Sequence, residues 1–186
     1  MSSAASTKTT TLDNLQAAFN GESNARASYL AFAAKADQEG YAPVASLFRA
    51  AARAEEIHAR NHAGVIAGMG AAPVANIETP AVKSTRENLR TAIKGELYEN
   101  EEMYPAFLKQ ARHESNDAAV DTFYLACEVE AEHARLYTKA LNALDTLKGA
   151  AVAYYVCPVC GFTAARVDFD LCPVCSTPGE QYEEVQ

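Results

Sequence analysis

The sequence predicts a mainly α-helical protein, a four-helix bundle followed by a small metal-bound domain of strands and loops. Four long segments place apolar residues at helical spacing, between glycines and prolines that lie far apart. The connection in the middle of these segments is longer than the others. Four of the five cysteines lie together between Cys157 and Cys175, near the end of the chain.

Composition limits the classes of function. Hydrophobic residues make up 49% of the 186 residues, which is enough for a buried core and argues against disorder. The net charge of −8, without a basic run, predicts no nucleic-acid partner. No apolar stretch has the length of a membrane span, so we expect no membrane partner. Residues 1–10 lack the apolar core of a secretory signal, and we expect a flexible N-terminus and a cytoplasmic protein.

The first two helices are expected at residues 11–38 and about 42–67. Thr10 and Asp13 can form a capping box at the start of the first. Pro43 suits the first turn of the second.

The second half of the bundle begins after the long connection at residues 71–83, which we interpret as a crossover. A third helix is expected from about residue 84 to 113, where Pro105 should kink or shorten it. A fourth is expected at about 117–147. Four helices with one long middle connection fit a ferritin-like bundle over residues 11–147.

The remaining chain changes in character. Residues 148–153 form a short linker rich in Gly and Ala, and residues 154–186 contain Pro, Gly, aromatic residues and four cysteines. This tail is too small for an apolar core of its own, so we expect a bound metal to hold it together.

Several acidic residues lie on the apolar stripes of the predicted helices. Glu22 is seven residues from both Leu15 and Tyr29, so the three share a face. On the stripes of the other helices lie two Glu-x-x-His pairs and one pair of glutamates: Glu55 with His58, Glu130 with His133, and Glu96 with Glu99.

These acids form an internal repeat. Glu22 is followed 33 residues later by Glu55 and its histidine, and Glu96 is followed 34 residues later by Glu130 and its histidine. One Glu from each of two helices and a Glu-x-x-His from each of the other two is the ligand pattern of a carboxylate-bridged di-metal site.

Charge balance supports a metal site. Five buried carboxylates would carry five negative charges, which is costly without cations. Two divalent ions would bring the sum to −1 and two trivalent ions to +1, so the site is near neutrality across a two-electron change. Mixed carboxylate and imidazole ligands suit iron or manganese.

Two further residues lie near this pattern. His62 is one turn after His58, but nothing matches it in the other half, so a packed or surface histidine is favoured over a ligand. Cys127 is one turn before Glu130, and we interpret it as a small buried residue.

The tail contains two Cys-Pro-Val-Cys knuckles, separated by eleven residues: Cys157, Cys160, Cys172 and Cys175. Four thiolates so arranged form a tetrahedral site for zinc or for a single iron. A structural zinc ribbon is the commoner outcome of this spacing. A one-electron iron relay is the better match to a neighbouring two-electron di-metal site.

The chain resembles the rubrerythrin family, in which a ferritin-like di-iron bundle precedes a rubredoxin-like Fe(Cys)4 domain. The resemblance extends from about residue 11 to the end. It is carried by GES at 21–23, EEIH at 55–58, GELYENEEMYP at 95–105, EVEAEH at 128–133 and the two CPVC knuckles.

The resemblance implies roles for the bundle residues. Glu55 and Glu130 would bridge two irons, with Glu22 terminal on one and Glu96 on the other. His133 would bind the iron held by Glu96.

It also implies an exchangeable pair, in which one iron takes Glu99 when oxidised and moves to the side of His58 when reduced. Tyr29 and Tyr104 would hydrogen-bond the carboxylates, and the four knuckle cysteines would hold the third iron.

The implied activity is reduction of hydrogen peroxide to water, in defence against oxidative stress. Electrons would come from NAD(P)H through a separate reductase or rubredoxin and the cysteine site. The alternative is a ferroxidase or iron-handling protein that uses O2 at the same site. A third interpretation is a non-catalytic bundle with a zinc-ribbon module.

Chain geometry suggests an assembly. Glu130 lies 17 residues before the expected helix end, roughly 25 Å away, while the linker at 148–153 extends ~20 Å at most. The tail would then barely reach its own di-iron site. We therefore expect a homodimer, head to tail, with electron transfer between subunits.

Overall fold

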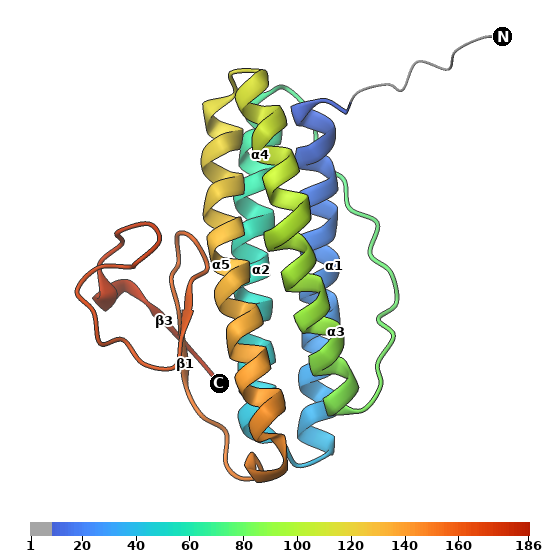
Figure 1. The fold of residues 1–186 in the computed structure, drawn as a ribbon, viewed down its shortest axis with the longest axis vertical. Coiled ribbons are helices and arrows are strands. Elements are labelled where there is room, and N and C mark those ends of the chain that lie inside the picture. The colour runs from blue at the N-terminus through green and yellow to red at the C-terminus, as the bar shows by residue number, and fades with distance from the viewer. Residues whose placement is uncertain (1–8) are drawn as a thin grey trace, which may run out of the picture.

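The computed structural model describes residues 9–186, and of the expected flexible N-terminus residues 1–8 lie outside the described part. It confirms a mainly helical protein with a four-helix bundle and a small cysteine-bearing domain (Figure 1). Helices α1 (Thr11–Gln38) and α2 (Ala42–Gly68) form the first antiparallel pair. The capping box of Thr10 and Asp13 starts α1 as expected. Gly40, at φ 80°, makes the sharp turn between the two helices.

The long connection after α2 runs as an extended segment along the outside of α1 (Figure 1). Three polar side chains of α1, four residues apart, bind its backbone. Gln16 donates to the Ala72 carbonyl, and Asn20 and Asn24 accept from the amides of Asn76 and Glu78. These bonds satisfy a segment that has no regular secondary structure of its own.

The third helical segment is divided into three parts. Helix α3 (Thr85–Tyr98) continues through a π-helical turn, η1 (Glu99–Met103), into α4 (Tyr104–His113). The expected effect of Pro105 is seen as a distortion of the preceding turn, because η1 contains Glu101, whose carbonyl a proline four residues later cannot bind.

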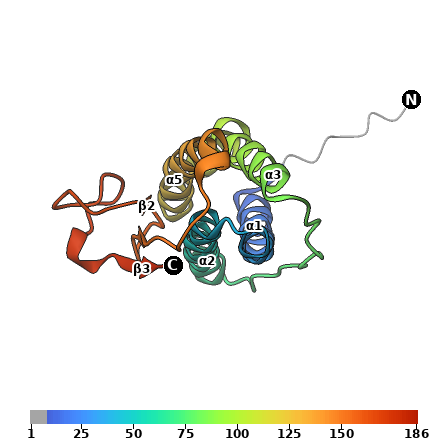
Figure 2. The same ribbon diagram turned by 90° about the horizontal axis from the view of Figure 1, so that it is seen from below.

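Helix α5 (Asp117–Ala143) completes the bundle and ends in a single 3-10 turn, η2 (Leu144–Thr146). The chain then reverses into a three-stranded antiparallel sheet with strand order β2-β1-β3. The strands are β1 (Tyr154–Val156), β2 (Thr163–Ala164) and β3 (Glu183–Val185), with a 3-10 turn, η3 (Gly179–Gln181), before β3. Figure 2 shows this domain against α2 and α5, on the side away from α1 and α3.

The bundle interior has two apolar layers with a polar layer between them. Around Tyr29, Phe48 and Tyr137 lies one layer, and around Leu15 and Phe123 lies the other. Along α1, Glu22 falls between residues of the two layers, and the acids of α2 and α5 do the same. The apolar layers therefore enclose a buried ring of carboxylates. No helix in residues 9–186 has the length and apolarity needed to cross a membrane.

Candidate metal centre

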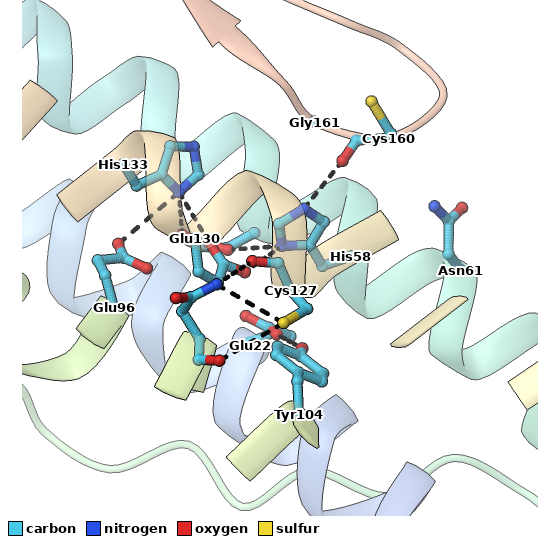
Figure 3. Close-up of polar contacts among 12 residues, drawn as sticks. Glu22, His58, Asn61, Glu96, Tyr104, Cys127, Glu130, His133, Cys160 and Gly161 are labelled. Carbon is cyan, nitrogen blue, oxygen red and sulfur yellow. Dashed lines mark hydrogen bonds and ion pairs between the residues drawn. The ribbon is translucent and has the colours of Figure 1, made fainter. Parts of the chain in front are cut away.

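All four long helices contribute acidic side chains to the polar layer (Figure 3). Potential ligand atoms form two groups, and within each group all of them lie within 4.8 Å of one another. One group is Glu22, Glu55, His58 and Glu130, and the other is Glu55, Glu96, Glu130 and His133. The two groups share Glu55 and Glu130, one from each Glu-x-x-His pair. Shared carboxylates between two adjacent groups are the arrangement that bridges two metal ions.

The cluster contains buried polar atoms that other protein groups do not satisfy. Within residues 9–186, no hydrogen-bond partner exists for one oxygen each of Glu22, Glu55 and Glu96, both oxygens of Glu130, or Nδ1 of His133. His133 Nδ1 lies 2.9 Å from Glu130 Oε2, yet the pair lacks hydrogen-bond geometry. Unpaired buried acceptors are costly. These atoms converge on shared points, so the residues fit cations.

The pKa values of the cluster also indicate that its residues fit cations. Burial, followed by the negative charge of neighbouring carboxylates, raises the pKa of Glu22, Glu96 and Glu99 well above the ordinary value. Burial opposes a charge on His133, but the adjoining carboxylates of Glu130 and Glu55 raise its pKa to about 9. Without metal, the cluster therefore retains protons that bound cations would replace.

Two buried tyrosines hold the terminal carboxylates. The Tyr29 hydroxyl donates to Glu96 Oε1 at 2.6 Å, and the Tyr104 hydroxyl donates to Glu22 Oε1. Each tyrosine thus fixes one oxygen of a carboxylate and leaves the other oxygen unpaired.

Glu99 is separate from the two ligand groups among the described residues. It is the first residue of η1 and is half-buried, whereas His58 is fully buried in the first group. The charges of Glu96 and Glu130 contribute to its raised pKa, so its carboxylate is close to the cluster. His58 therefore lies in the ligand group, and Glu99 lies beside it.

The four knuckle cysteines form a third potential ligand group. Their sulfurs pair closely, with Cys157 Sγ 3.5 Å from Cys175 Sγ and Cys160 Sγ 3.6 Å from Cys172 Sγ. All are free thiols. The two knuckles repeat one turn, in which the amides of Gly161 and Ser176 donate to the carbonyls of the first cysteine of each knuckle. Four thiolates at one point are a tetrahedral metal site.

The cysteine domain touches both cluster histidines. His58 Nε2 lies 2.9 Å from the Cys160 carbonyl oxygen, and His133 Nε2 lies 3.1 Å from Thr163 Oγ1 (Figure 3 draws the first). The Thr163 hydroxyl donates to the Gly161 carbonyl, so it accepts from His133. Both histidines therefore carry a proton on Nε2, which leaves Nδ1, on the cluster side, as the atom that would bind a metal ion.

The expectation that the tail barely reaches its own bundle site is wrong. The Cys160–His58 contact lies within one chain. The calculated reach counted only the linker, but β1 also runs back along the bundle and adds ~3.3 Å per residue. Arg60 and Asn61 of α2 then bind the carbonyls of Pro158 and Val159. A second subunit is not needed to bring the two sites together.

Four residues near the centre were not identified from the sequence as parts of it: Gly161, Thr163, His62 and Thr122. Gly161 directly follows Cys160 and Thr163 lies three residues after it, but only the docking of the domain brings them to the histidines. His62 is fully buried outside both ligand groups. Burial, together with the charge of His58, lowers the pKa of His62 to about 3.

The fold and these two sites define a class of protein, the non-haem di-iron bundle proteins with a rubredoxin-like domain. The rubrerythrin family model matches residues 13–141. Nigerythrin from Nitratidesulfovibrio vulgaris (strain Hildenborough) is 38% identical over 173 residues, which cover 92% of this chain and 85% of the relative. Rubrerythrin-2 from Clostridium acetobutylicum is 34% identical, covering 93% of this chain and 95% of the relative.

A solved structure of nigerythrin in its fully reduced, all-ferrous state has a TM-score of 0.88 to this chain at 37% identity, covering 97% of this chain and 91% of that one. The chain therefore belongs to the rubrerythrin family. Its cofactors are two non-haem iron ions in the bundle and one iron ion in the four-cysteine site.

Proposed function

We propose that this protein is a peroxidase that reduces hydrogen peroxide to water at the bundle site. The observation that carries the proposal is the 2.9 Å approach of the Cys160 carbonyl to His58, which joins a one-electron site to a two-electron site within one chain. A ferroxidase takes its electrons from incoming iron and needs no such connection. Membership of the rubrerythrin family supports the same activity.

The ligand roles follow from the two groups. Glu55 and Glu130 would be the carboxylates shared by the two metal ions, because both groups contain them. Glu22 and Glu96 are terminal, and each is held by a tyrosine. His58 and His133 complete the two groups through Nδ1.

Reduction of one hydrogen peroxide to two waters takes two electrons and two protons. When bound, the iron pair would supply the two electrons, and iron in the cysteine site would replace them one at a time. Glu99 is suited to deliver a proton, because burial and neighbouring charges raise its pKa and it is partly exposed beside the cluster. We also propose that Glu99 and His58 exchange as ligands of one iron.

The electron source is proposed from the family resemblance alone. It is NAD(P)H acting through a separate reductase or a rubredoxin that docks at the cysteine domain. A head-to-tail homodimer remains a prediction from the family resemblance, and a cytoplasmic location remains a prediction of the sequence.

The test is rapid mixing of the fully reduced, iron-loaded protein with hydrogen peroxide or with O2. We expect the visible thiolate-to-iron absorption of the cysteine site to return much faster with peroxide. A protein with a redox-silent metal in the tail, obtained by loading zinc there, is the control and should oxidise only at the bundle.

Faster oxidation by O2, with iron as the preferred electron donor, would instead establish the ferroxidase. A tail that accepts zinc alone after anaerobic reconstitution with iron would remove the electron relay and with it the peroxidase proposal.

A further inference from the structure

A surface pocket of about 460 Å³ lies where α2, α5 and the first cysteine knuckle meet. Its lining includes Arg60, Asn61, Asp121, Thr122 and Val159. Thr122 is only 6% exposed, so it is a buried residue that borders the pocket. The pocket therefore brings solvent to the side chain of a buried threonine, whose hydroxyl lies close to the bundle interior.

A continuous chain of hydrogen bonds leads inward from that hydroxyl. Thr122 Oγ1 lies 3.0 Å from His62 Nδ1, and His62 Nε2 lies 3.0 Å from the Tyr104 hydroxyl. Tyr104 in turn binds Glu22 Oε1, a member of the first ligand group (Figure 3). His62, Tyr104 and Glu22 are fully buried. Among the described residues of this hydrogen-bonded series, Thr122 is therefore the one that borders the pocket.

The donors in this chain all point the same way. Glu22 must be ionised to bind a metal, so the Tyr104 hydroxyl donates to it and can only accept from His62. The Nε2 atom of His62 is then the protonated nitrogen, and Nδ1 accepts from Thr122. Each group donates to the next, from the pocket to the ligand.

We propose that Thr122, His62 and Tyr104 form a proton relay from the surface pocket to Glu22, which supplies one of the two protons of peroxide reduction. This inference rests on the proposed function. His62 is thus a relay residue, which explains why a histidine is buried next to the site without belonging to either ligand group. The relay enters the cluster on the side of Glu22, away from Glu96.

The transfer balances without oxidation or reduction. One proton from pocket water binds Thr122 Oγ1, and the original hydroxyl proton passes to His62 Nδ1. The Nε2 proton of His62 passes to the Tyr104 oxygen, whose own proton passes to Glu22 Oε1 and from there to an oxygen of peroxide, so that Glu22 is ionised again. The chain then points outward, so the hydroxyls and the imidazole must reorient before it carries another proton. The relay therefore carries one proton per turnover.

The decisive variant is Thr122→Val, which keeps the shape of the side chain and removes the hydroxyl. Thr122→Ser is its matched partner, because it retains the hydroxyl. With iron loaded, we expect Thr122→Val to slow oxidation of the reduced protein by peroxide about ten-fold or more. The solvent isotope effect on that step should increase, because proton delivery becomes slower than the other steps. Thr122→Ser should restore most of the rate.

A second measurement does not depend on turnover. In the full-length chain loaded with diamagnetic zinc, ¹⁵N NMR should report His62 as the neutral Nε2–H form with Nδ1 accepting a hydrogen bond. In Thr122→Val the Nδ1 resonance should move to the position of a free nitrogen, while Nε2 stays protonated. Iron content and melting temperature should remain those of the parent.

These readouts separate the two proposals. A parent protein that peroxide oxidises no faster than O2 does would refute the peroxidase, while the NMR result would still test the hydrogen-bonded chain. Fast peroxide oxidation that is unchanged in Thr122→Val, or a His62 protonated on Nδ1, would overturn the relay.

Discussion

Gly161 allows the cysteine loop to come close to His58. Its φ of +84° lies in the left-handed region, and a Cβ there would be 2.8 Å from His58 Nε2 and 3.1 Å from the Ala54 side chain. Both the backbone conformation and the close approach therefore require glycine. The contact that joins the two metal sites depends on the absence of one methyl group.

We expect Gly161→Ala to push the loop away from His58 and to slow electron return to the bundle several-fold. The strained backbone should also lower the free energy of unfolding by about 1–2 kcal/mol. Gly68→Ala is the control, since a Cβ there meets nothing within 4 Å and φ is not positive. Rapid reduction kinetics, with the two iron sites followed separately, measure the effect. Equal electron-transfer rates in both variants would contradict the role of this contact.

Tyr29 and Tyr137 offer a matched comparison of a hydrogen bond with mere packing. Both are buried in the same apolar layer, with ring centroids 5.5 Å apart. The Tyr29 hydroxyl donates to Glu96, whereas the Tyr137 hydroxyl has no hydrogen-bond partner in the described part of the chain.

Tyr29→Phe should weaken metal binding at the site of Glu96 by about ten-fold, because a partner that orients a ligand is lost. Tyr137→Phe should leave that affinity within error of the parent. Titration of the apoprotein with a divalent metal under chelator competition measures both. Equal losses of metal affinity in the two variants would mean that the hydrogen bond from Tyr29 to Glu96 does not contribute to metal binding.

At the scale of elements, the π-helical turn η1 determines which side chains of the third helical segment, α3 to α4, face the metal site. Glu96 and Tyr104 are eight residues apart, which in an α-helix is about 80° beyond two full turns. The wider turn at Glu99–Met103 takes up the additional residue. Both Glu96 and Tyr104 are therefore fully buried, each at one end of the cluster.

The docking of the cysteine domain on α2 includes one bidentate ion pair. Arg53 Nε lies 2.7 Å from Glu183 Oε2, and Arg53 also binds Oε1 at 3.0 Å, which joins α2 to β3. Since the side chains are 26% and 40% exposed, solvent weakens the pair.

A double-mutant cycle of Arg53→Met and Glu183→Gln should give a coupling energy of about 0.5–1 kcal/mol in urea unfolding. The control cycle is Arg166→Met with Asp168→Asn, an ion pair of 2.8 Å that lies within the tail and is far more exposed. Its coupling should be close to zero. A coupling for the first cycle no larger than that of the control would show that this pair does not secure the domain.

At the scale of the whole molecule, the buried cluster couples stability to pH. Burial and mutual repulsion raise the pKa of Glu22 and Glu96, and neighbouring carboxylates raise the pKa of His133 to about 9. The folded apoprotein therefore binds more protons than the unfolded chain between the ordinary carboxyl pKa and about pH 9. Its free energy of unfolding must fall as the pH rises through that window.

Metal binding reverses this dependence, because cations replace those protons. We expect the melting temperature of the metal-free protein to decrease from pH 5.5 to pH 8.5. The increase in melting temperature on adding metal should grow over the same range. Calorimetry of both forms across pH checks this, and a metal-free protein that becomes more stable toward pH 8.5 would disprove it.

Helix positions, the carboxylate–histidine repeat and the cysteine knuckles were predictable because each depends on local spacing. Glu22, Glu55 and Glu130 had to lie on apolar faces at helical periodicity, and such faces pack together in a bundle. Buried like charges at those positions then require cations. The sequence by itself therefore determined the fold class, the pattern of the di-metal cluster and the four-thiolate site.

Only the tertiary structure decided how these parts meet. The π turn lets both Glu96 and Tyr104 face the interior, and Pro105 predicts a distortion of this helix but not its π-helical form. The course of β1 brings Cys160 to His58, which the linker length alone did not reveal. The bonds from Thr122 to His62 and from His62 to Tyr104 join residues 60 and 42 positions apart in the chain. Contacts of this kind depend on which surfaces pack together, so no periodicity in the sequence encodes them.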